Sequence, residues 1–185
     1  MEQLRLTDAH KETHFRDMSL LHALGWRAAY REYIPDSFLS EAITDNRWVP
    51  VFRQNYEEGV YRGLILYAGD RPLCCATYGP ARVDRSTGDT ICNFSSPDLS
   101  AWGELVSLYA HPDYWRQGYG SIVMEEILNR MQAAGYPGCF LYVLRENDRA
   151  RRFYETHGFA WDGHSLEVVL TPDTILTDLR YCKVF

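Results

Sequence analysis

The stretch from Glu104 to Ser121 carries residue types and spacings that can bind an anionic group. An apolar run of strand length ends at His111-Pro112-Asp113, because proline lacks an amide hydrogen and restricts the residue before it. Gly118 and Gly120 then begin an amphipathic helix. The start of a helix has unpaired N–H groups and a partial positive charge, and glycine lets a ligand come close to that backbone. The pattern therefore predicts a loop that binds a phosphate or pyrophosphate.

Two common nucleotide-binding motifs do not fit this loop. The dinucleotide fingerprint G-x-G-x-x-G requires Gly or Ala where this chain has Val123. The nucleotide P-loop requires a lysine after its second glycine, and none follows here. Because G-x-G is a weak signal by itself, a glycine turn that only lets a helix pack on a strand stays open as the alternative.

Size and charge limit the class of protein. The chain has 185 residues, of which 46% are hydrophobic and 24% charged, so we expect one globular domain over residues 1–185. Its formal net charge of −6 argues against a general nucleic-acid binder, which needs a basic face. The first residues lack the apolar core of a signal peptide, and no apolar run reaches the roughly 20 residues that span a bilayer. We therefore expect neither nucleic acid nor membrane as a partner.

The cysteines predict the redox compartment. They are odd in number, scattered and without C-x-x-C spacing, so neither a disulfide framework nor a metal site is expected. A reducing cytoplasm fits this usage best. The cysteines are Cys74, Cys75, Cys92, Cys139 and Cys182.

Hydrophobic periodicity predicts the elements around the loop. The first half should form a short strand, three helical segments and a hairpin, at Gln3–Thr7, at His14–Tyr33, Phe38–Ile43 and from Trp48, and at Gly63–Ala68 with Leu73–Tyr78. A long polar loop should follow from Gly79 to Ala101.

The second half should alternate strands and helices, which predicts an α/β fold with a mixed sheet flanked by helices. We expect a buried strand at Leu105–Ala110, a helix at Ser121–Ala134, a strand at Cys139–Leu144, a helix from Asn147 or Asp148 to Gly158, and strands at Phe159–Trp161, Leu166–Leu170 and Ile175–Phe185. The second helix should bury four residues, Ala150, Phe153, Tyr154 and His157.

Two spaced motifs resemble the GNAT superfamily of acyl-CoA N-acetyltransferases. The first is L-Y-A-H-P-D-Y-W-R-Q-G-Y-G-S, which contains the family's [Q/R]-x-x-G-x-[G/A] loop at Trp115–Gly120. Its first position is Trp115, with Arg116 displaced by one, so the side chain that supports the loop stays open. The second motif is N-D-R-A-R-R-F-Y-E-T-H-G-F, from Asn147 to Phe159, which matches the family pattern N-x-x-A-x-x-F-Y-x-x-x-G-F. The resemblance implies a central mixed, mostly antiparallel sheet with splayed central strands.

The resemblance also implies that coenzyme A, as acetyl-CoA, lies in the gap of the splayed strands. The strand backbone would pair with the pantetheine arm, the loop amides would hold the pyrophosphate, and the second motif would contact the cofactor. An ordinary core strand is the alternative for the first of these. The implied cofactor-binding residues are Leu108, Tyr109 and Ala110; Arg116, Gln117, Gly118, Tyr119, Gly120 and Ser121; and Asn147, Ala150 and Phe153.

The reaction that the resemblance implies needs a base and a hydrogen donor. An amine of lysine type has a reference pKa near ~10.4, so its proton must be removed before it attacks a thioester. Glu104 at the start of the central strand is the candidate base, against the alternative of a solvated strand-end carboxylate. Tyr154 is the candidate donor to the leaving sulfur, against the alternative of a core tyrosine. On the acceptor side, Tyr30, Tyr33 and Asp36 offer aromatic and acidic groups that suit a cationic amine.

We therefore predict an acetyl-CoA-dependent N-acetyltransferase that acts on a primary amine, which is a small molecule, an amino acid or a protein N-terminus. A non-catalytic acyl-CoA-binding or regulatory module is the alternative. A nucleotide-binding enzyme is disfavoured by the missing third glycine and lysine. The oligomeric state, monomer or homodimer, is left open.

Overall fold

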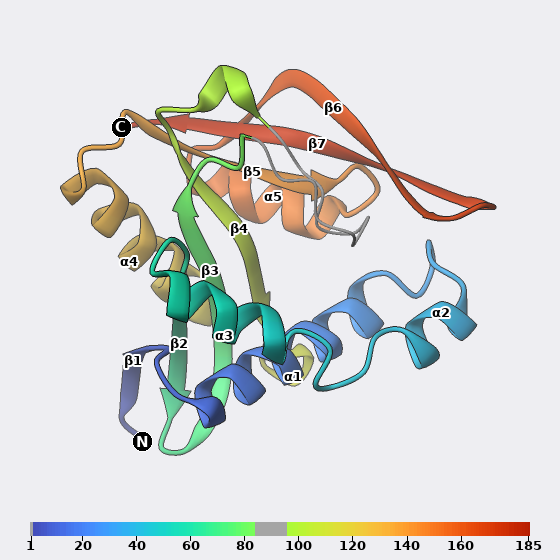
Figure 1. The fold of residues 1–185 in the computed structure, drawn as a ribbon, viewed down its shortest axis with the longest axis horizontal. Coiled ribbons are helices and arrows are strands. Elements are labelled where there is room, and N and C mark those ends of the chain that lie inside the picture. Colours follow the sequence, from blue (N-terminus) through green and yellow to red (C-terminus); the bar gives the residue numbers. More distant parts are fainter. Residues whose placement is uncertain (1, 84–95) are drawn as a thin grey trace. The chain divides into compact units, whose positions relative to one another are not determined.

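The computed structural model describes residues 2–83 and 96–185, and the chain falls into two compact units (Figure 1). Unit 1 comprises Met1–Tyr78 and Ser107–Ile127, and unit 2 comprises Gly79–Val106 and Leu128–Phe185. Each unit is therefore built from two separate segments of the chain. The single domain expected over 1–185 stays a prediction.

Helices and strands follow the predicted order closely. The helices are α1 (Glu12–Ala29), α2 (Asp36–Glu41), α3 (Val49–Glu58), α4 (Tyr119–Ala133) and α5 (Asp148–Thr156). The strands are β1 (Leu4–Asp8), β2 (Arg62–Ala68), β3 (Arg71–Pro80), β4 (Gly103–Ala110), β5 (Gly138–Leu144), β6 (Ala160–Thr171) and β7 (Thr174–Val184). Within the described ranges, no helix is both long and apolar enough to cross a membrane.

Seven strands form a sheet in the order β1-β2-β3-β4-β5-β7-β6. The pairs β1–β2, β2–β3, β5–β7 and β6–β7 are antiparallel. The pair β4–β5 is parallel, and its register joins Gly103 to Cys139 and Glu104 to Phe140. The predicted mixed, mostly antiparallel sheet flanked by helices is confirmed.

Unit 1 packs α1 and α3 beside the β1–β2–β3 part of the sheet (Figure 1). Met18 and Leu21 of α1 are fully buried, as the helical spacing of its apolar residues requires. Gly25 lies near the C-terminal end of α1, where a Cβ atom would collide with the Tyr109 ring. Glycine at this position therefore lets the second half of β4 approach the helix.

Unit 2 packs α5 on one face of β7. The Tyr181 hydroxyl accepts from Arg151 Nε at 3.1 Å and donates to Glu155 Oε1 at 3.0 Å, so both of these helical residues hold α5 on the Tyr181 face. The strand β5 is buried except at Tyr142, as expected for a strand covered on both sides. The long antiparallel hairpin β6–β7 follows it in the sheet (Figure 1).

Three predictions about these elements were wrong. Of the four residues expected to be buried by α5, only Tyr154 is buried, whereas Ala150, Phe153 and His157 are half-exposed. The run Leu105–Ala110 was expected to be buried, but β4 is buried only over Gly103–Leu105 and half-exposed from Val106 to Ala110. Hydrophobic pattern reports which residues are apolar, but not whether the chain leaves one side of them uncovered.

The third wrong prediction concerns the chain after α5. The two short strands expected at Phe159–Trp161 and Leu166–Leu170 are one strand, β6, with a register shift between Trp161 and Ser165. The polar Asp162, Gly163 and His164 stand at this irregularity, which is why the apolar pattern appeared interrupted. Most of the predicted Gly79–Ala101 loop, residues 84–95, lies outside the described residues.

Candidate functional site

The loop between β4 and α4 adopts an unusual backbone conformation. Arg116 has φ of 64° and Gly118 has φ of 84°, which are both left-handed values. A left-handed arginine is uncommon, because its Cβ crowds the backbone. Trp115 holds the loop in place, since its indole Nε1–H donates to the Ala110 carbonyl at 3.0 Å. The open question of which side chain supports the loop is thus answered by Trp115, and Arg116 is exposed.

The loop ends at a helix start that offers backbone donors. The Gly118 carbonyl accepts from Ser121 N at 3.0 Å and from Ile122 N at 3.2 Å, so α4 begins there. The amides of Tyr119 and Gly120 therefore precede the first bond of the helix, as the first N–H groups of any helix do. A Cβ atom on Gly118 would meet no atom within 4 Å, so the space beside this backbone is open. Alternating left-handed residues before a helix N-terminus suit an anion such as a pyrophosphate.

The β4 backbone leads directly into this loop. Leu108, Tyr109 and Ala110 are half-exposed although β4 stands between β3 and β5 in the strand order. The Tyr109 ring packs against the His22 ring at a centroid distance of 4.4 Å. An ordinary core strand would be covered along its whole length. The half-exposed Leu108–Ala110 segment therefore does not have the burial expected of such a strand.

The second motif caps and lines α5. Asn147 is the N-cap residue, and its side-chain Oδ1 accepts from Ala150 N at 3.1 Å. This bond uses the oxygen and leaves the amide NH₂ of Asn147 as a donor. Ala150 and Phe153 are half-exposed and lie in the first and second turns of the helix. The residues that the resemblance assigns to the cofactor thus offer accessible surface.

Tyr154 is the buried member of α5. Its ring lies beside Phe153 at 5.4 Å and beside Phe159 at 6.1 Å between centroids. It belongs to the helix that covers the Tyr181 face of unit 2.

Glu104 is 1% exposed and forms an ion pair with Arg82, so the alternative of a solvated strand-end carboxylate was wrong. Its Oε2 accepts from Arg82 N at 2.9 Å, and its Oε1 accepts from Arg82 Nε at 2.9 Å and from a terminal guanidinium nitrogen. A buried carboxylate needs such partners, because an unpaired charge in the interior is very costly. The sequence could not indicate Arg82, which stands in a stretch without a periodic pattern.

Glu104 belongs to a polar face on the side of the unit 2 sheet opposite α5. Paired residues of neighbouring strands share a face, and Glu104 pairs with Phe140 while Tyr142, two residues on, pairs with Arg180. Tyr142 Oη lies 2.6 Å from the Ser96 hydroxyl. Glu104 and Tyr154 therefore approach the sheet of unit 2 from opposite faces.

Arg180 anchors two further carboxylates on this polar face. Its guanidinium donates to Asp162 at 2.7 Å and to Asp98 at 2.9 Å. The hydrogen bond from Arg180 lowers the pKa of the Asp98 carboxyl below its ordinary value. The ends of the Gly79–Ala101 stretch thus supply Arg82, Ser96 and Asp98 to this face.

The residues expected on the acceptor side lie at the end of α1. Tyr30 and Tyr33 are half-exposed in the turn that follows the helix, and Asp36 is the exposed first residue of α2. The Tyr30 ring packs edge-on against Trp26 at 4.8 Å. These three side chains are presented at the surface of unit 1, as a substrate contact requires.

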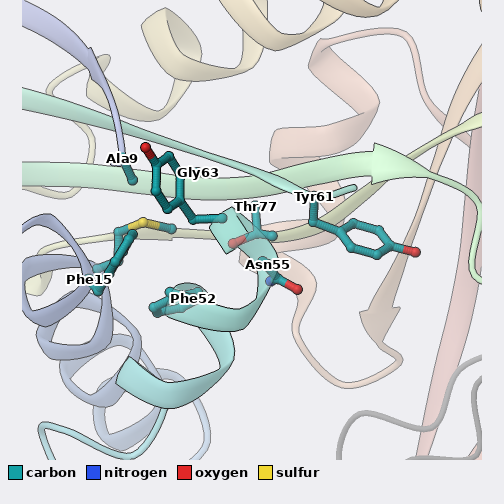
Figure 2. A pocket seen from close by; sticks show the side chains of 9 residues that line it. Ala9, Phe15, Phe52, Asn55, Tyr61, Gly63 and Thr77 are labelled. Atoms are coloured by element: carbon teal, nitrogen blue, oxygen red, sulfur yellow. The ribbon is translucent and has the colours of Figure 1, made fainter. Parts of the chain in front are cut away.

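A small pocket in unit 1 contains none of the predicted site residues. Figure 2 shows Phe52 and Asn55 of α3 facing it beside Thr77 of β3. The Thr77 hydroxyl is buried without a hydrogen-bond partner there. The pocket has room for about one water molecule, which is too little for a cofactor.

The described cysteines are free, and the buried ones are held as thiols. Burial raises the pKa of the Cys74 thiol to about 12 and that of Cys139 further above its ordinary value. Such thiols are poor nucleophiles at neutral pH. In the part of the chain that the structure describes, no group of His, Cys, Asp and Glu could hold a metal ion.

Comparison with known proteins identifies the family of this chain. It is similar to N-alpha-acetyltransferase 60 of Xenopus tropicalis, at 23% identity over 128 residues, which cover 68% of this chain and 48% of that protein. The match therefore spans about half the length of that relative.

Solved structures share the fold. The chain superimposes on PaiA N-acetyltransferase of Thermoplasma acidophilum in complex with coenzyme A, with a TM-score of 0.68, 16% identity and coverage of 98% of this chain and 99% of that one. It also superimposes on the ribosomal-protein-S18-alanine N-acetyltransferase of Escherichia coli, with a TM-score of 0.64, 17% identity and coverage of 98% and 94%. A sequence model of the Acetyltransferase (GNAT) family matches residues 25–159, which is most of the chain, and the protein therefore belongs to the GNAT acetyltransferase family.

Proposed function

We propose that this protein is an acetyl-CoA-dependent N-acetyltransferase that acts on a primary amine. The observation that carries the proposal is the half-exposed end of β4 that leads directly into a loop with two left-handed residues and a helix start. Backbone groups of this kind suit an extended arm followed by a diphosphate. Membership of the GNAT family and the coenzyme A complex of a protein with the same fold support this choice of cofactor.

Coenzyme A would be held mainly by main-chain groups. Leu108 and Ala110 offer the β4 backbone to the pantetheine arm, beside Tyr109. Amides from Gln117 to Gly120 would donate to the pyrophosphate, whereas the Ser121 amide already donates to the Gly118 carbonyl. The exposed Arg116 adds a positive charge. The free amide of Asn147, with the accessible surfaces of Ala150 and Phe153, completes the set. Bound acetyl-CoA supplies an acetyl group activated as a thioester.

Glu104 is the proposed base. Its Oε1 accepts two N–H groups of Arg82 and its Oε2 accepts one, so Oε2 keeps a lone pair for a proton. The proton would come from the amine directly or through a water molecule. Arg82 acts as a positioning residue, since it holds the carboxylate in one orientation.

Tyr154 is the proposed hydrogen donor to the sulfur that leaves. It stands on the opposite face of the unit 2 sheet from Glu104. The amine attacks perpendicular to the plane of a thioester, so base and sulfur donor need not share a side. Tyr154 then stabilises a thiolate by a hydrogen bond, which a phenol can donate without full proton transfer.

The acceptor is proposed to be a cationic primary amine held by Tyr30, Tyr33 and Asp36. A protein N-terminus is the acceptor class that the names of two similar proteins favour, N-alpha-acetyltransferase 60 and ribosomal-protein-S18-alanine N-acetyltransferase. Small amines and amino acids have the same reacting group. The buried Glu104–Arg82 pair favours a second candidate, an acyl-CoA-binding module without catalysis, because an ion-paired carboxylate is a less available base.

A thiol-release assay with acetyl-CoA and a panel of amines and N-terminal peptides tests the proposal. We expect turnover with at least one amine, and Tyr154→Phe should lower kcat by roughly 10- to 100-fold with coenzyme A affinity unchanged. Tyr56→Phe is the matched control, because Tyr56 is a helical tyrosine that is 51% exposed. Glu104→Gln should remove the acidic limb of the pH–rate profile, on which the rate rises as the base loses its proton.

Each result in this assay separates the two candidates. Coenzyme A binding without thiol release from any amine would favour the binding module. Turnover by Tyr154→Phe at the wild-type rate would remove the role of that hydroxyl, and an unchanged pH–rate profile of Glu104→Gln would remove the proposed base.

A further inference from the structure

His22 and Ser107 form a hydrogen-bonded pair in unit 1 that the proposed reaction has not used. His22 Nε2 lies 2.9 Å from Ser107 Oγ, and His22 Nδ1 lies 2.9 Å from the Met18 carbonyl oxygen. The two residues are 85 positions apart in the chain, on α1 and on β4. Ser107 directly precedes Leu108, whose backbone is proposed to bind the pantetheine arm.

The Met18 carbonyl fixes the tautomer of His22. A carbonyl oxygen has no hydrogen, so the hydrogen of a neutral imidazole must sit on Nδ1 and be donated to it. His22 is kept neutral because burial lowers its pKa to about 4. Its Nε2 therefore carries a lone pair and accepts the hydroxyl hydrogen of Ser107.

The hydrogen bond to His22 fixes the direction of the Ser107 O–H group. Serine has one hydrogen and two lone pairs, and the hydrogen is donated to His22. The remaining capacity of Oγ is to accept. The Ser107 oxygen can therefore accept a hydrogen bond from an N–H group but cannot donate one to a carbonyl oxygen. A freely rotating serine could do either.

The aromatic rings around His22 keep this hydrogen bond in place. The rings of Tyr109, Phe52 and Trp48 lie around His22 at centroid distances of 4.4, 4.9 and 5.4 Å. His22 is 4% exposed, whereas Ser107 is half-buried. Ser107 is therefore the more accessible member of the pair.

We propose that Ser107, oriented by His22, accepts a hydrogen bond from the N–H of the amine substrate. The proposal rests on the function proposed above and favours amine over hydroxyl acceptors, because an amine keeps an N–H after the base has taken one hydrogen and a hydroxyl does not. Ser107 directly precedes the Leu108–Ala110 backbone of β4, which is proposed to hold the pantetheine arm whose thioester the amine attacks. Ser107 contacts the substrate, and His22 is a positioning residue that acts through it.

Two variants of Ser107, and a double variant that also changes His22, test the pair. Ser107→Ala should raise KM for the amine by about tenfold and leave KM for acetyl-CoA unchanged, because one neutral hydrogen bond is lost. It should also lower Tm, since Nε2 of His22 loses its partner in a buried place. Ser107→Thr keeps the hydroxyl and should restore most of the amine affinity.

The double variant Ser107→Ala with His22→Phe separates binding from folding. Replacing both members of a buried hydrogen bond by apolar groups is close to neutral for stability, so Tm should recover toward the wild-type value. KM for the amine should stay as high as in Ser107→Ala alone, because His22 acts only through Ser107. A pair that only satisfies buried polar groups would give the opposite result, with KM recovering together with Tm.

Other outcomes overturn the inference in distinguishable ways. An unchanged KM for the amine in Ser107→Ala, with the wild type active, removes this inference alone. A rise confined to KM for acetyl-CoA assigns Ser107 to an amide of the pantetheine arm, and acetylated Ser107 in an intact-mass measurement makes it a nucleophile. A wild type that transfers acetyl to no amine defeats the proposed function, and the inference falls with it.

Discussion

Glu104 and His22 are both buried ionisable side chains, but Glu104 has charged and N–H partners whereas His22 has only neutral ones. Glu104 is given a guanidinium and a backbone amide, so its charge is compensated where it stands. His22 is given a carbonyl, a hydroxyl and three aromatic rings, which compensate a neutral imidazole only. A buried charge without a partner is far more costly than a buried neutral polar group. The surroundings of Glu104 therefore offer hydrogen-bond donors to a carboxylate, whereas those of His22 suit a neutral imidazole.

The lowered pKa of His22 predicts a loss of stability in acid. Its pKa of about 4 in the folded protein is below the ordinary 6.5, so the unfolded chain binds the proton more tightly. This contribution to the free energy of unfolding is complete above pH 6.5 and is lost as the pH falls through 4. The difference of pKa values corresponds to about 3 kcal/mol at most. We therefore expect His22→Phe to reduce the change in the free energy of unfolding between pH 6.5 and pH 4 by up to this amount.

Urea unfolding of the wild type and His22→Phe at several pH values checks this expectation. The exposed His10 provides the control, since His10→Phe removes a histidine without removing a buried one. Parallel stability curves for wild type and His22→Phe over this window would contradict the assigned cause.

At the scale of elements, the loop before α4 gives a prediction that separates strain from binding. Gly118 and Gly59 have φ values of 84° and 67°, and a Cβ atom on either would meet nothing within 4 Å. Alanine is strained in this left-handed conformation by roughly 1–2 kcal/mol, so Gly118→Ala and Gly59→Ala should cost similar stability. Gly59 ends α3, outside the proposed cofactor loop. Only Gly118→Ala should also weaken coenzyme A binding, by about tenfold or more, because relief of the strain moves the donor amides.

Isothermal titration with coenzyme A, together with thermal unfolding of both variants, measures the two effects. Equal dissociation constants for Gly118→Ala and Gly59→Ala would mean that the loop conformation does not contribute to binding. A large loss of stability in Gly118→Ala alone would assign the glycine to folding instead.

The elements show where sequence reasoning succeeds and where it stops. The apolar stripe of Val123, Met124 and Ile127 predicted α4, because local periodicity and packing agree there. The sequence predicted that α5 begins at Asn147 or Asp148, and the structure shows Asn147 as the cap, because its side chain accepts from an amide in the first turn of the same helix.

Residues that act through distant partners could not be predicted in this way. Arg82 meets Glu104 22 positions later, and His22 meets Ser107 85 positions later, and no local pattern encodes either pairing. The half-exposed end of β4 was missed for the same reason, since an apolar run has the same composition whether it is covered or left open to a ligand. Site residues of local origin were thus predictable, and the environment of Glu104 was not.

At the scale of the whole molecule, the net charge works against the proposed cofactor. The chain carries a formal charge of −6, and coenzyme A is itself anionic. General electrostatic attraction therefore cannot supply the affinity, which must come from local donors such as the loop amides and from the β4 backbone. Recognition should depend on the whole shape of the ligand more than on its phosphates.

The rise in Tm on adding different ligands tests whether recognition needs the pantetheine arm as well as the phosphates. A ligand that binds only the folded protein stabilises it by about 2.7 kcal/mol at a concentration 100 times its dissociation constant. For a protein of this size we expect coenzyme A and acetyl-CoA to raise Tm by roughly 5–10 °C at that concentration. ATP and NAD have a chain of phosphates but no pantetheine arm, so the β4 backbone would gain nothing from them and their effect should be much smaller. An equal rise with ATP would mean that the loop binds phosphate without β4, and a rise with NAD but not with coenzyme A would revive the nucleotide-binding alternative.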